Sequence, residues 1–348
     1  MGRPHQGIRI SRPDWIALIL LQLGTSILFA SRGWLTYKWD SPIRELIWEE
    51  KWWTPVLEKF DITWGHFART SDSWITPTLE WTGVFLMISA ILPWLPLLPR
   101  LQWTRWLLVP VILVLAIDAF ARWVSKDMHA GTMMEYALRV FSPVALILIF
   151  RRDTIHSTNR RLTIIWLLLL ATALTFTGHG LYAVGYYDVP LNFRTMTSEI
   201  IPASESTILL ILEAAGWLDF LIVALVLIPR MPKIPMLGLG YLVVSTLTIL
   251  LATFWSPLDM TGGMGFILGA LVLIPFIPNA RLMGLIYMTL WGGATTLARI
   301  WAYYDPNLPS NGLDPWFAEA LVRTPHWLIP LWLIIWLKEK PNSRRKDF

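Results

Sequence analysis

The 348-residue sequence contains no cysteine. Disulfide bonds, thiolate metal sites and dithiol redox chemistry are therefore excluded for this chain. Charged residues are also scarce, at 15% of the sequence, against about 25% in soluble domains. No P-loop, no GxSxG or HExxH sequence and no dinucleotide-binding fingerprint occurs, so the sequence does not support the enzyme chemistry that these motifs carry.

Hydrophobic residues, in contrast, make up 55% of the chain, and the mean hydropathy is +0.51. Apolar stretches recur along the whole length, and a helix needs about 20 such residues to cross a bilayer core about 30 Å thick. We therefore predict an all-α, polytopic transmembrane helix bundle of about ten spans. The expected spans are residues 14–32, 79–97, 103–124, 133–150, 161–183, 206–229, 236–254, 262–278, 282–301 and 324–338. Most of the 22 tryptophans lie near the ends of these spans, as in an interfacial aromatic belt.

The distribution of charge predicts the orientation. With ten spans, both ends of the chain and four short loops lie on one side of the membrane. That side carries 17 basic and 4 acidic residues, a net charge of +13, whereas the rest carries 12 basic and 20 acidic residues, a net charge of −8. Because lysine and arginine concentrate on the cytoplasmic side, we expect cytoplasmic N- and C-termini. The basic pI then reflects topology, and no nucleic-acid partner is expected.

Short polar fragments recur in two parts of the chain. Arg32-Gly33 ends the first expected span, as His179-Gly180 ends the fifth. The pattern E-x-x-G opens the second span at residues 80–83 and the sixth at residues 213–216. Three later residues have counterparts in the same order, namely Arg122 with Arg299, Glu135 with Glu319, and Arg139 with Arg323.

These matches predict two related halves, residues 1–150 and 151–348, with a helical pair inserted in the second half at about residues 236–278. The first four spans would superpose on spans five, six, nine and ten. Matched spans point the same way, so the repeats are parallel. Inverted repeats are the more common signature of transporters, and the parallel arrangement therefore weakens an alternating-access interpretation.

These fragments, together with Arg100 or Arg105 and Arg230 beyond the E-x-x-G helices, resemble the DoxX-like family of membrane proteins. Residues 259–262, with Arg281, give a third partial match. The resemblance implies an enlarged tandem pair of four-helix bundles in the bacterial inner membrane. Members of that family are associated with quinone-linked sulfur oxidation or with accessory roles in membrane complexes.

Most ionisable residues of the spans lie at the predicted outer ends, and only Asp118 and Asp219 lie a turn or two deeper. The expected polar cluster consists of Arg32, Glu80, Arg122, Glu135, Arg139, His179, Glu213, Asp259, Arg299, Glu319 and Arg323. Carboxylates complement helix N-termini, and a glutamate four residues before an arginine pairs readily with it. We therefore expect helix caps and ion pairs, with Glu80 and Glu213 contacting Arg32 and His179. A crevice for an anionic or quinone-like ligand, and a docking surface for a partner subunit, are the alternatives.

Residues 33–78 form the longest expected extramembrane segment. Ser41-Pro42 is a favourable helix start, because the serine side chain can cap the helix and proline suits its first position. Apolar residues spaced between Ile43 and Leu57 predict an amphipathic helix on the outer membrane surface.

Histidines could also hold a haem, since two imidazoles at similar depth on different helices can ligate iron. His129 and His179 are the candidates, and no other metal site is expected. The favoured function is a non-catalytic integral subunit or scaffold of an inner-membrane complex, which could be a redox complex. Lipids and other membrane subunits are the expected partners. The alternative is a carrier, or an oxidoreductase component that interacts with quinone or haem b.

Overall fold

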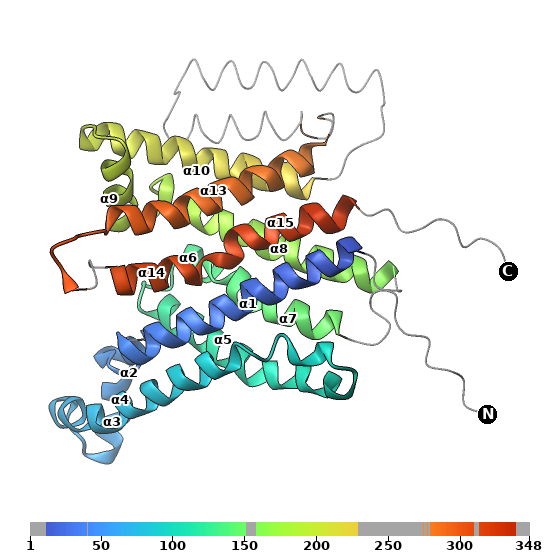
Figure 1. Cartoon of the computed structure of the whole chain (residues 1–348). Coiled ribbons are helices and arrows are strands. Elements are labelled where there is room, and N and C mark those ends of the chain that lie inside the picture. Colours follow the sequence, from blue (N-terminus) through green and yellow to red (C-terminus); the bar gives the residue numbers. More distant parts are fainter. Residues whose placement is uncertain are drawn as a thin grey trace, which may run out of the picture.

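The computed structural model describes residues 12–39, 41–150, 158–228, 279–309 and 313–338, together with residues 274 and 277. Within these ranges every regular element is a helix (Figure 1). Six segments are long and apolar enough to cross a membrane: Trp15–Lys38, Arg100–Val124, Ala130–Ile149, Asn159–Ala183, Glu205–Leu227 and Asp314–Leu337. The chain is therefore a multi-pass, all-helical membrane protein by the length and composition of its helices.

The six segments coincide with the expected spans one, three, four, five, six and ten. Helix α13 (Ala280–Ala302) follows the ninth expected span closely, although it does not belong to the six. The seventh and eighth expected spans lie outside the described residues, apart from residues 274 and 277. The second expected span is misplaced, because helix α4 runs from Trp64 to Ser89.

Two local signals explain the position of α4. Its first turn is capped by Thr63, whose hydroxyl accepts a hydrogen bond from the backbone N–H of His66 at 3.3 Å. The chain after Ser89 contains several prolines, which lack the N–H that a helix needs, and it continues as turns and 3-10 helices at Leu95–Leu97 and Pro99–Leu107. Hydropathy located only the apolar second part of this helix and extended it too far.

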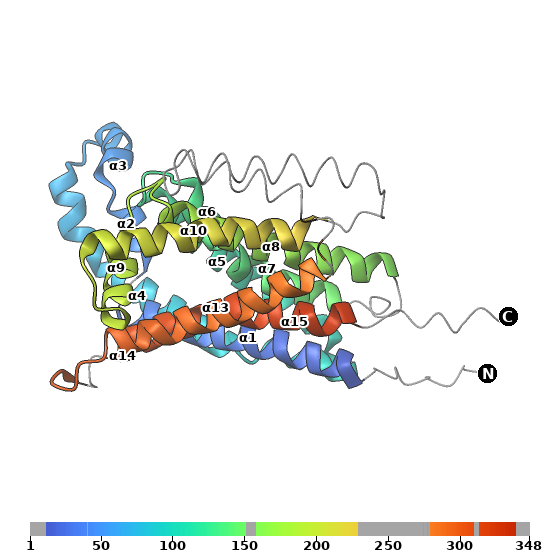
Figure 2. The same cartoon turned by 90° about the horizontal axis from the view of Figure 1, so that it is seen from above.

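The long helices lie side by side along one common direction (Figures 1 and 2). Besides α4 and α13 they are α1 (Arg12–Lys38), α5 (Leu108–Val124), α7 (Ala137–Ile149), α8 (Thr158–Ala183), α10 (Glu205–Leu227) and α15 (Thr324–Lys338). The short helices α2 (Pro42–Ile47), α3 (Glu50–Leu57), α6 (Ala130–Glu135), α9 (Leu191–Ile200) and α14 (Leu313–Val322) lie toward one end, here called the hairpin end. The start of α1 and the end of α15 lie together at the opposite end.

Two helices organise the packing of the bundle. Helix α1 packs against α4, α14 and α15, whereas α8 packs against α10, α6 and α7. Their shared core contains fully buried side chains from both parts of the chain, including Leu28, Phe29, Leu168 and Trp332. The first and last described helices are therefore neighbours in the folded molecule.

Glycines allow the closest helix contacts. A Cβ atom on Gly33 of α1 would lie 2.6 Å from the carbonyl oxygen of Gly83 on α4. A Cβ atom on Gly216 of α10 would lie 2.9 Å from the carbonyl oxygen of Gly180 on α8. Only glycine permits such an approach of two backbones, so the fragments that recur in the sequence form two helix crossings.

Arginines at the opposite end of the bundle bind the ends of helices. Arg105, Arg161 and Arg281 each donate a hydrogen bond to a carbonyl at the C-terminal end of α7, α15 and α10, at 2.7, 2.8 and 2.8 Å respectively. These carbonyls lack helical partners and carry the negative end of the helix dipole. The basic residues that predict orientation thus also cap helices in this structure.

The expected long helix of residues 43–57 is divided in two. Ser41 caps α2 through a hydrogen bond from the backbone N–H of Ile43, with Pro42 at the first position, as predicted. Helix α2 then ends at Ile47, and α3 begins at Glu50. Arg44 of α2 pairs with Asp72 of α4, and this hydrogen bond lowers the pKa of the Asp72 carboxyl. Contacts with the first turns of α4 therefore hold this segment.

Candidate functional site

Charged side chains from several helices meet inside the bundle near the hairpin end. Arg32, Asp118, Arg139, Arg299 and His326 are each less than a tenth exposed. Such residues are seldom this buried unless they are paired. We define the charge cluster as Arg32, Glu45, Asp118, Arg122, Glu135, Arg139, His179, Arg299, Glu319, Arg323 and His326.

One part of the charge cluster joins α1, α2 and α5. Arg32 contacts Asp118 at 2.6 Å, and their side chains are only 7% and 5% exposed. The Ser41 hydroxyl donates to the same Asp118 oxygen at 3.3 Å, so the residue that caps α2 also completes this ion pair. Arg122 reaches both carboxylate oxygens of Glu45 at 3.0 Å. These contacts fix α2 against the bundle.

The other part joins α6, α8, α14 and α15. The Nδ1 atom of His179 lies 2.9 Å from Glu135, and Arg323 lies 2.7 Å from Glu319, four residues before it. The ring of His326 meets the ring of His179 edge to face, with centroids 5.4 Å apart. The expected pairing of Glu319 with Arg323 is present. Glu135 is paired with His179 instead of Arg139, because the helix is interrupted at Tyr136, between α6 and α7.

Two buried arginines have no carboxylate partner among the described residues. Arg139 places its guanidinium over the ring of Tyr136, 4.3 Å from the centroid, and its Nε atom has no hydrogen-bond partner. Arg299 is 4% exposed, and its Nε atom is likewise buried without a partner. Arg323 and Arg139 repel the positive charge of Arg299 electrostatically. Glu319 attracts it, although it forms no ion pair with Arg299 among the described residues. Arg299 is thus a buried cation without an ion pair in the described part of the chain.

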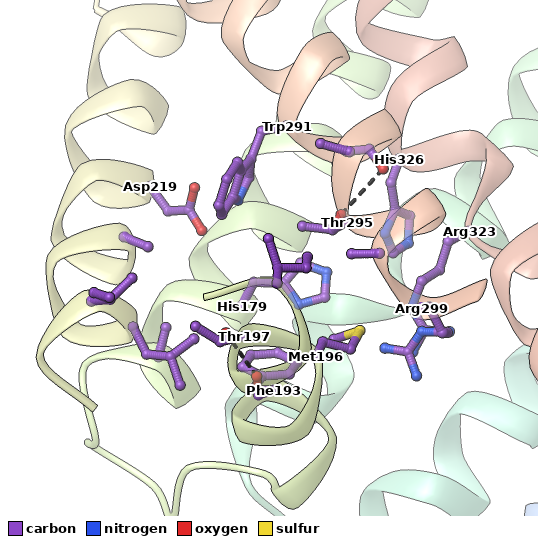
Figure 3. A pocket seen from close by; sticks show the side chains of 18 of the residues that line it. His179, Phe193, Met196, Thr197, Asp219, Trp291, Thr295, Arg299, Arg323 and His326 are labelled. Carbon is purple, nitrogen blue, oxygen red and sulfur yellow. Dashed lines mark hydrogen bonds between the residues drawn. The ribbon is translucent and has the colours of Figure 1, made fainter. Parts of the chain in front are cut away.

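A cavity of about 340 Å³ opens beside Arg299, between α8, α9, α10, α13 and the start of α15 (Figure 3). Its wall is largely apolar, with aromatic side chains from α8, α9 and α13. His179, Arg299, Arg323 and His326 supply the basic groups of the lining. In Figure 3 Asp219 lies next to Trp291, on the far side of the cavity from Arg299 and Arg323. The cavity is therefore apolar along its walls and cationic on one side.

Most of the sequence-predicted cluster does come together. The charge cluster contains eight of the eleven predicted residues: Arg32, Arg122, Glu135, Arg139, His179, Arg299, Glu319 and Arg323. Asp259 lies outside the described residues. Glu213 is half-buried on α10, and its carboxylate is 3.5 Å from the indole nitrogen of Trp217.

The predicted contacts of Glu80 and Glu213 with Arg32 and His179 are wrong. Glu80 is exposed in the middle of α4 and forms no ion pair with the described residues, because α4 begins 16 residues earlier at Trp64. It therefore has no helix N-terminus to complement. Arg32 of α1 and His179 of α8 bind carboxylates on α5 and α6 instead.

Four important residues were outside the predicted cluster: Glu45, Asp118, Asp219 and His326. Asp118 and Asp219 were visible as lone carboxylates within apolar runs, which is itself a functional signal in membrane proteins. Glu45 belongs to the segment that was expected to lie on a membrane surface. His326 gave no signal beyond its position near a span end.

The two histidines considered for haem have separate contacts. His129 stacks on Tyr187, with centroids 4.1 Å apart, and His179 contacts Glu135 and His326. Within the described ranges, no group of three or more histidine, aspartate or glutamate side chains is arranged to hold a metal ion.

Comparison of the chain with protein-family models, with curated proteins and with solved structures found no match. The class of the molecule, a multi-pass helical membrane protein with a buried charge cluster and an adjoining cavity, therefore rests on its own sequence and structure.

Proposed function

We propose that this protein binds an amphipathic ligand in the cavity between α8, α9, α10 and α13, with the anionic or quinone-like head of the ligand at Arg299. The observation that carries the proposal is the buried Arg299 in the cavity wall, whose Nε atom has no hydrogen-bond partner and whose side chain has no ion pair among the described residues. An ion removed from water costs several kcal/mol unless a counter-charge and hydrogen bonds replace its hydration. Such a cation inside a membrane protein typically marks a ligand pathway.

The rest of the cavity supports the same class of ligand. Arginine binds carboxylate, phosphate or sulfonate oxygens through its planar set of donors, and Arg323 and His326 stand beside it. The apolar walls suit an alkyl or isoprenoid chain, and a volume of about 340 Å³ lies within the usual range of small-molecule sites. A carrier or a quinone-interacting component would both use such a site.

Binding of a permanently anionic probe tests this function. Dodecane-1-sulfonate should bind the protein in phosphatidylcholine nanodiscs more tightly than dodecanol or dodecyltrimethylammonium, as measured by calorimetry. Arg299→Gln should weaken sulfonate binding at least about tenfold, the usual range for a lost charged hydrogen-bonding partner. Arg69→Gln, which removes the same charge from an exposed site on α4, is the control. Equal affinity for the three probes, or an unchanged Arg299→Gln protein, would contradict the proposal.

A second candidate function is that of an integral subunit or scaffold, and the surface of the hairpin end favours it. Trp52 and Phe60 are 45% and 70% exposed there, in the segment that links α1 to α4. Such exposed aromatic side chains are common in protein interfaces. A partner should copurify at fixed stoichiometry with the native protein and be lost from a Trp52→Ser, Phe60→Ser double variant. The visible absorbance of the purified protein separates haem binding from a plain scaffold, which would have a featureless visible spectrum, and extraction with an organic solvent tests for bound quinone.

We further propose about ten spans, cytoplasmic termini in a bacterial inner membrane, and a duplicated DoxX-like origin of the two halves. Three features support the duplication. The glycine crossings of α1 with α4 and of α8 with α10 involve the same sequence fragments. Helix α1 contacts α14 and α15, while α8 contacts α6 and α7. Matched helices also run in the same direction.

A further inference from the structure

Asp219 is a carboxylate in the interior of α10. It lies fourteen residues after Glu205, about 21 Å into the helix at 1.5 Å per residue, and is 3% exposed. The hydroxyl of Tyr287 on α13 donates to it at 3.3 Å. Among the described residues it has no ion pair, yet its side chain lines the cavity that contains Arg299.

The charged and titratable groups that face Asp219 can be followed on each described helix that packs against α10. Helix α8 contributes His179 to the cavity wall, and α13 contributes Tyr287 and Arg299. The described part of α9 places apolar residues and Thr197 there. Arg323 and His326 complete the basic groups of the lining, on the far side from Asp219 (Figure 3).

We propose that Asp219 is a proton-binding site, and that an anion bound at Arg299 and a proton bound at Asp219 stabilise each other. The coupling rests on the proposed ligand-binding function, whereas the proton site does not. A lone charged carboxylate at this depth is costly, and the proton on Asp219 removes that cost. It also removes the repulsion between Asp219 and an anion that shares the cavity.

The sign and size of the coupling follow from the geometry. Tyr287, which contacts Asp219, lies twelve residues before Arg299 on α13, a rise of about 18 Å. Two unit charges at about 18 Å, in a medium of effective dielectric constant about 20, change an affinity about fivefold. Anion binding should therefore be about fivefold tighter when Asp219 is neutral, and by linkage the anion should promote proton uptake to the same extent. A carrier with this site would move the anion and the proton together.

Carbodiimide labelling tests the proton site without any ligand. Dicyclohexylcarbodiimide, an apolar reagent, adds to protonated carboxyl groups in apolar surroundings. The peptide that contains Asp219 should gain one reagent mass in the folded wild-type protein and none in Asp219→Asn. Labelling should be faster at about pH 6 than at about pH 8. The Tyr287→Phe protein should still be labelled at Asp219. A folded wild-type protein that stays unlabelled at Asp219 at both pH values would overturn the proton site.

Binding of dodecane-1-sulfonate at about pH 6 and about pH 8 tests the coupling. The comparison uses variants, which separate the effect of Asp219 from that of the basic groups in the lining. Asp219→Asn should bind the probe about fivefold more tightly than wild type at pH 8, whereas Glu80→Gln, which neutralises an exposed carboxylate on α4 outside the cavity, should not. Equal binding by Asp219→Asn and wild type at pH 8 would overturn the coupling. If the wild type shows no preference for the sulfonate, both the coupling and the proposed ligand-binding function are wrong. Labelling of Asp219 would still establish the proton site.

Discussion

At the scale of single residues, the ion pair of Arg32 with Asp118 is the most enclosed of the charge cluster, since the other pairs keep more exposed side chains. The sequence shows that Asp118 interrupts an apolar run, and its burial could be expected from that alone, whereas Arg32 lies at the end of an expected span. It does not show how each helix is rotated about its axis. Partner choice depends on that rotation and on where each helix begins, so the sequence does not indicate that Arg32 pairs with Asp118 and not with Glu80.

Asp118→Asn should lower the stability of the protein because it leaves the buried Arg32 guanidinium without a counter-charge. Loss of one partner from a buried pair typically costs about 3–5 kcal/mol. Glu80→Gln is the matched control, because it removes a charge from an exposed carboxylate that has no ion pair with the described residues, and it should change stability by less than about 0.5 kcal/mol. Thermal unfolding in detergent measures both. Similar melting temperatures for the two variants would show that Asp118 is not a structural counter-ion.

At the scale of helices, a helix start that depends on neighbouring residues could be predicted from the sequence. The full extent of a helix that depends on packing in the folded protein could not. The start of α2 at Ser41-Pro42 follows from a cap and a proline, and the structure contains it. The first turns of α4 are polar, so hydropathy could not locate them, although Thr63 is an ordinary N-cap residue. Hydropathy measures transfer to lipid, and a helix that extends beyond the lipid leaves no such signal.

Two glycines of α4, Gly83 at the crossing with α1 and Gly65 outside it, allow a comparison of substitutions within one helix. Gly83→Ala would place a Cβ atom 2.6 Å from the backbone nitrogen of Tyr37 and 2.7 Å from the carbonyl oxygen of Gly33. We expect a loss of about 1–3 kcal/mol from this overpacking. Gly65→Ala, also on α4, meets no atom within 4 Å and should be neutral or stabilising by up to about 1 kcal/mol. Equal melting temperatures in detergent would contradict a tight crossing of α1 and α4.

At the scale of the whole molecule, the composition was sufficient to predict an all-helical, multi-pass protein. The charge asymmetry also predicts that the first and last described residues lie at one end of the bundle, as they do in Figure 1. The packing of α1 against α15 could not be predicted. Both helices are apolar nearly all round, so neither sequence indicates which face meets protein and which meets lipid.

The natural absence of cysteine makes the topology directly measurable. A single cysteine at the exposed Lys59, between α3 and α4, should react with a membrane-impermeant maleimide in intact cells. A cysteine at Ser343, near the C-terminus, should react only after the cells are permeabilised. The unmodified protein provides an unlabelled control. Labelling of both positions under the same condition would contradict the proposed even number of spans.

The contact of α1 with α14 and α15 has a consequence for biosynthesis. Helix α1 can pair with α4 soon after both leave the ribosome, and α8 can pair with α10 in the same way, because each pair is close in the chain. The second face of α1, however, finds its partners only when the final helices are translated. Until then this face must be covered by the insertion machinery or by lipid. A chain shortened before α14 would leave that surface of α1 without its packing partners, and we expect it to be less stable than the full-length chain.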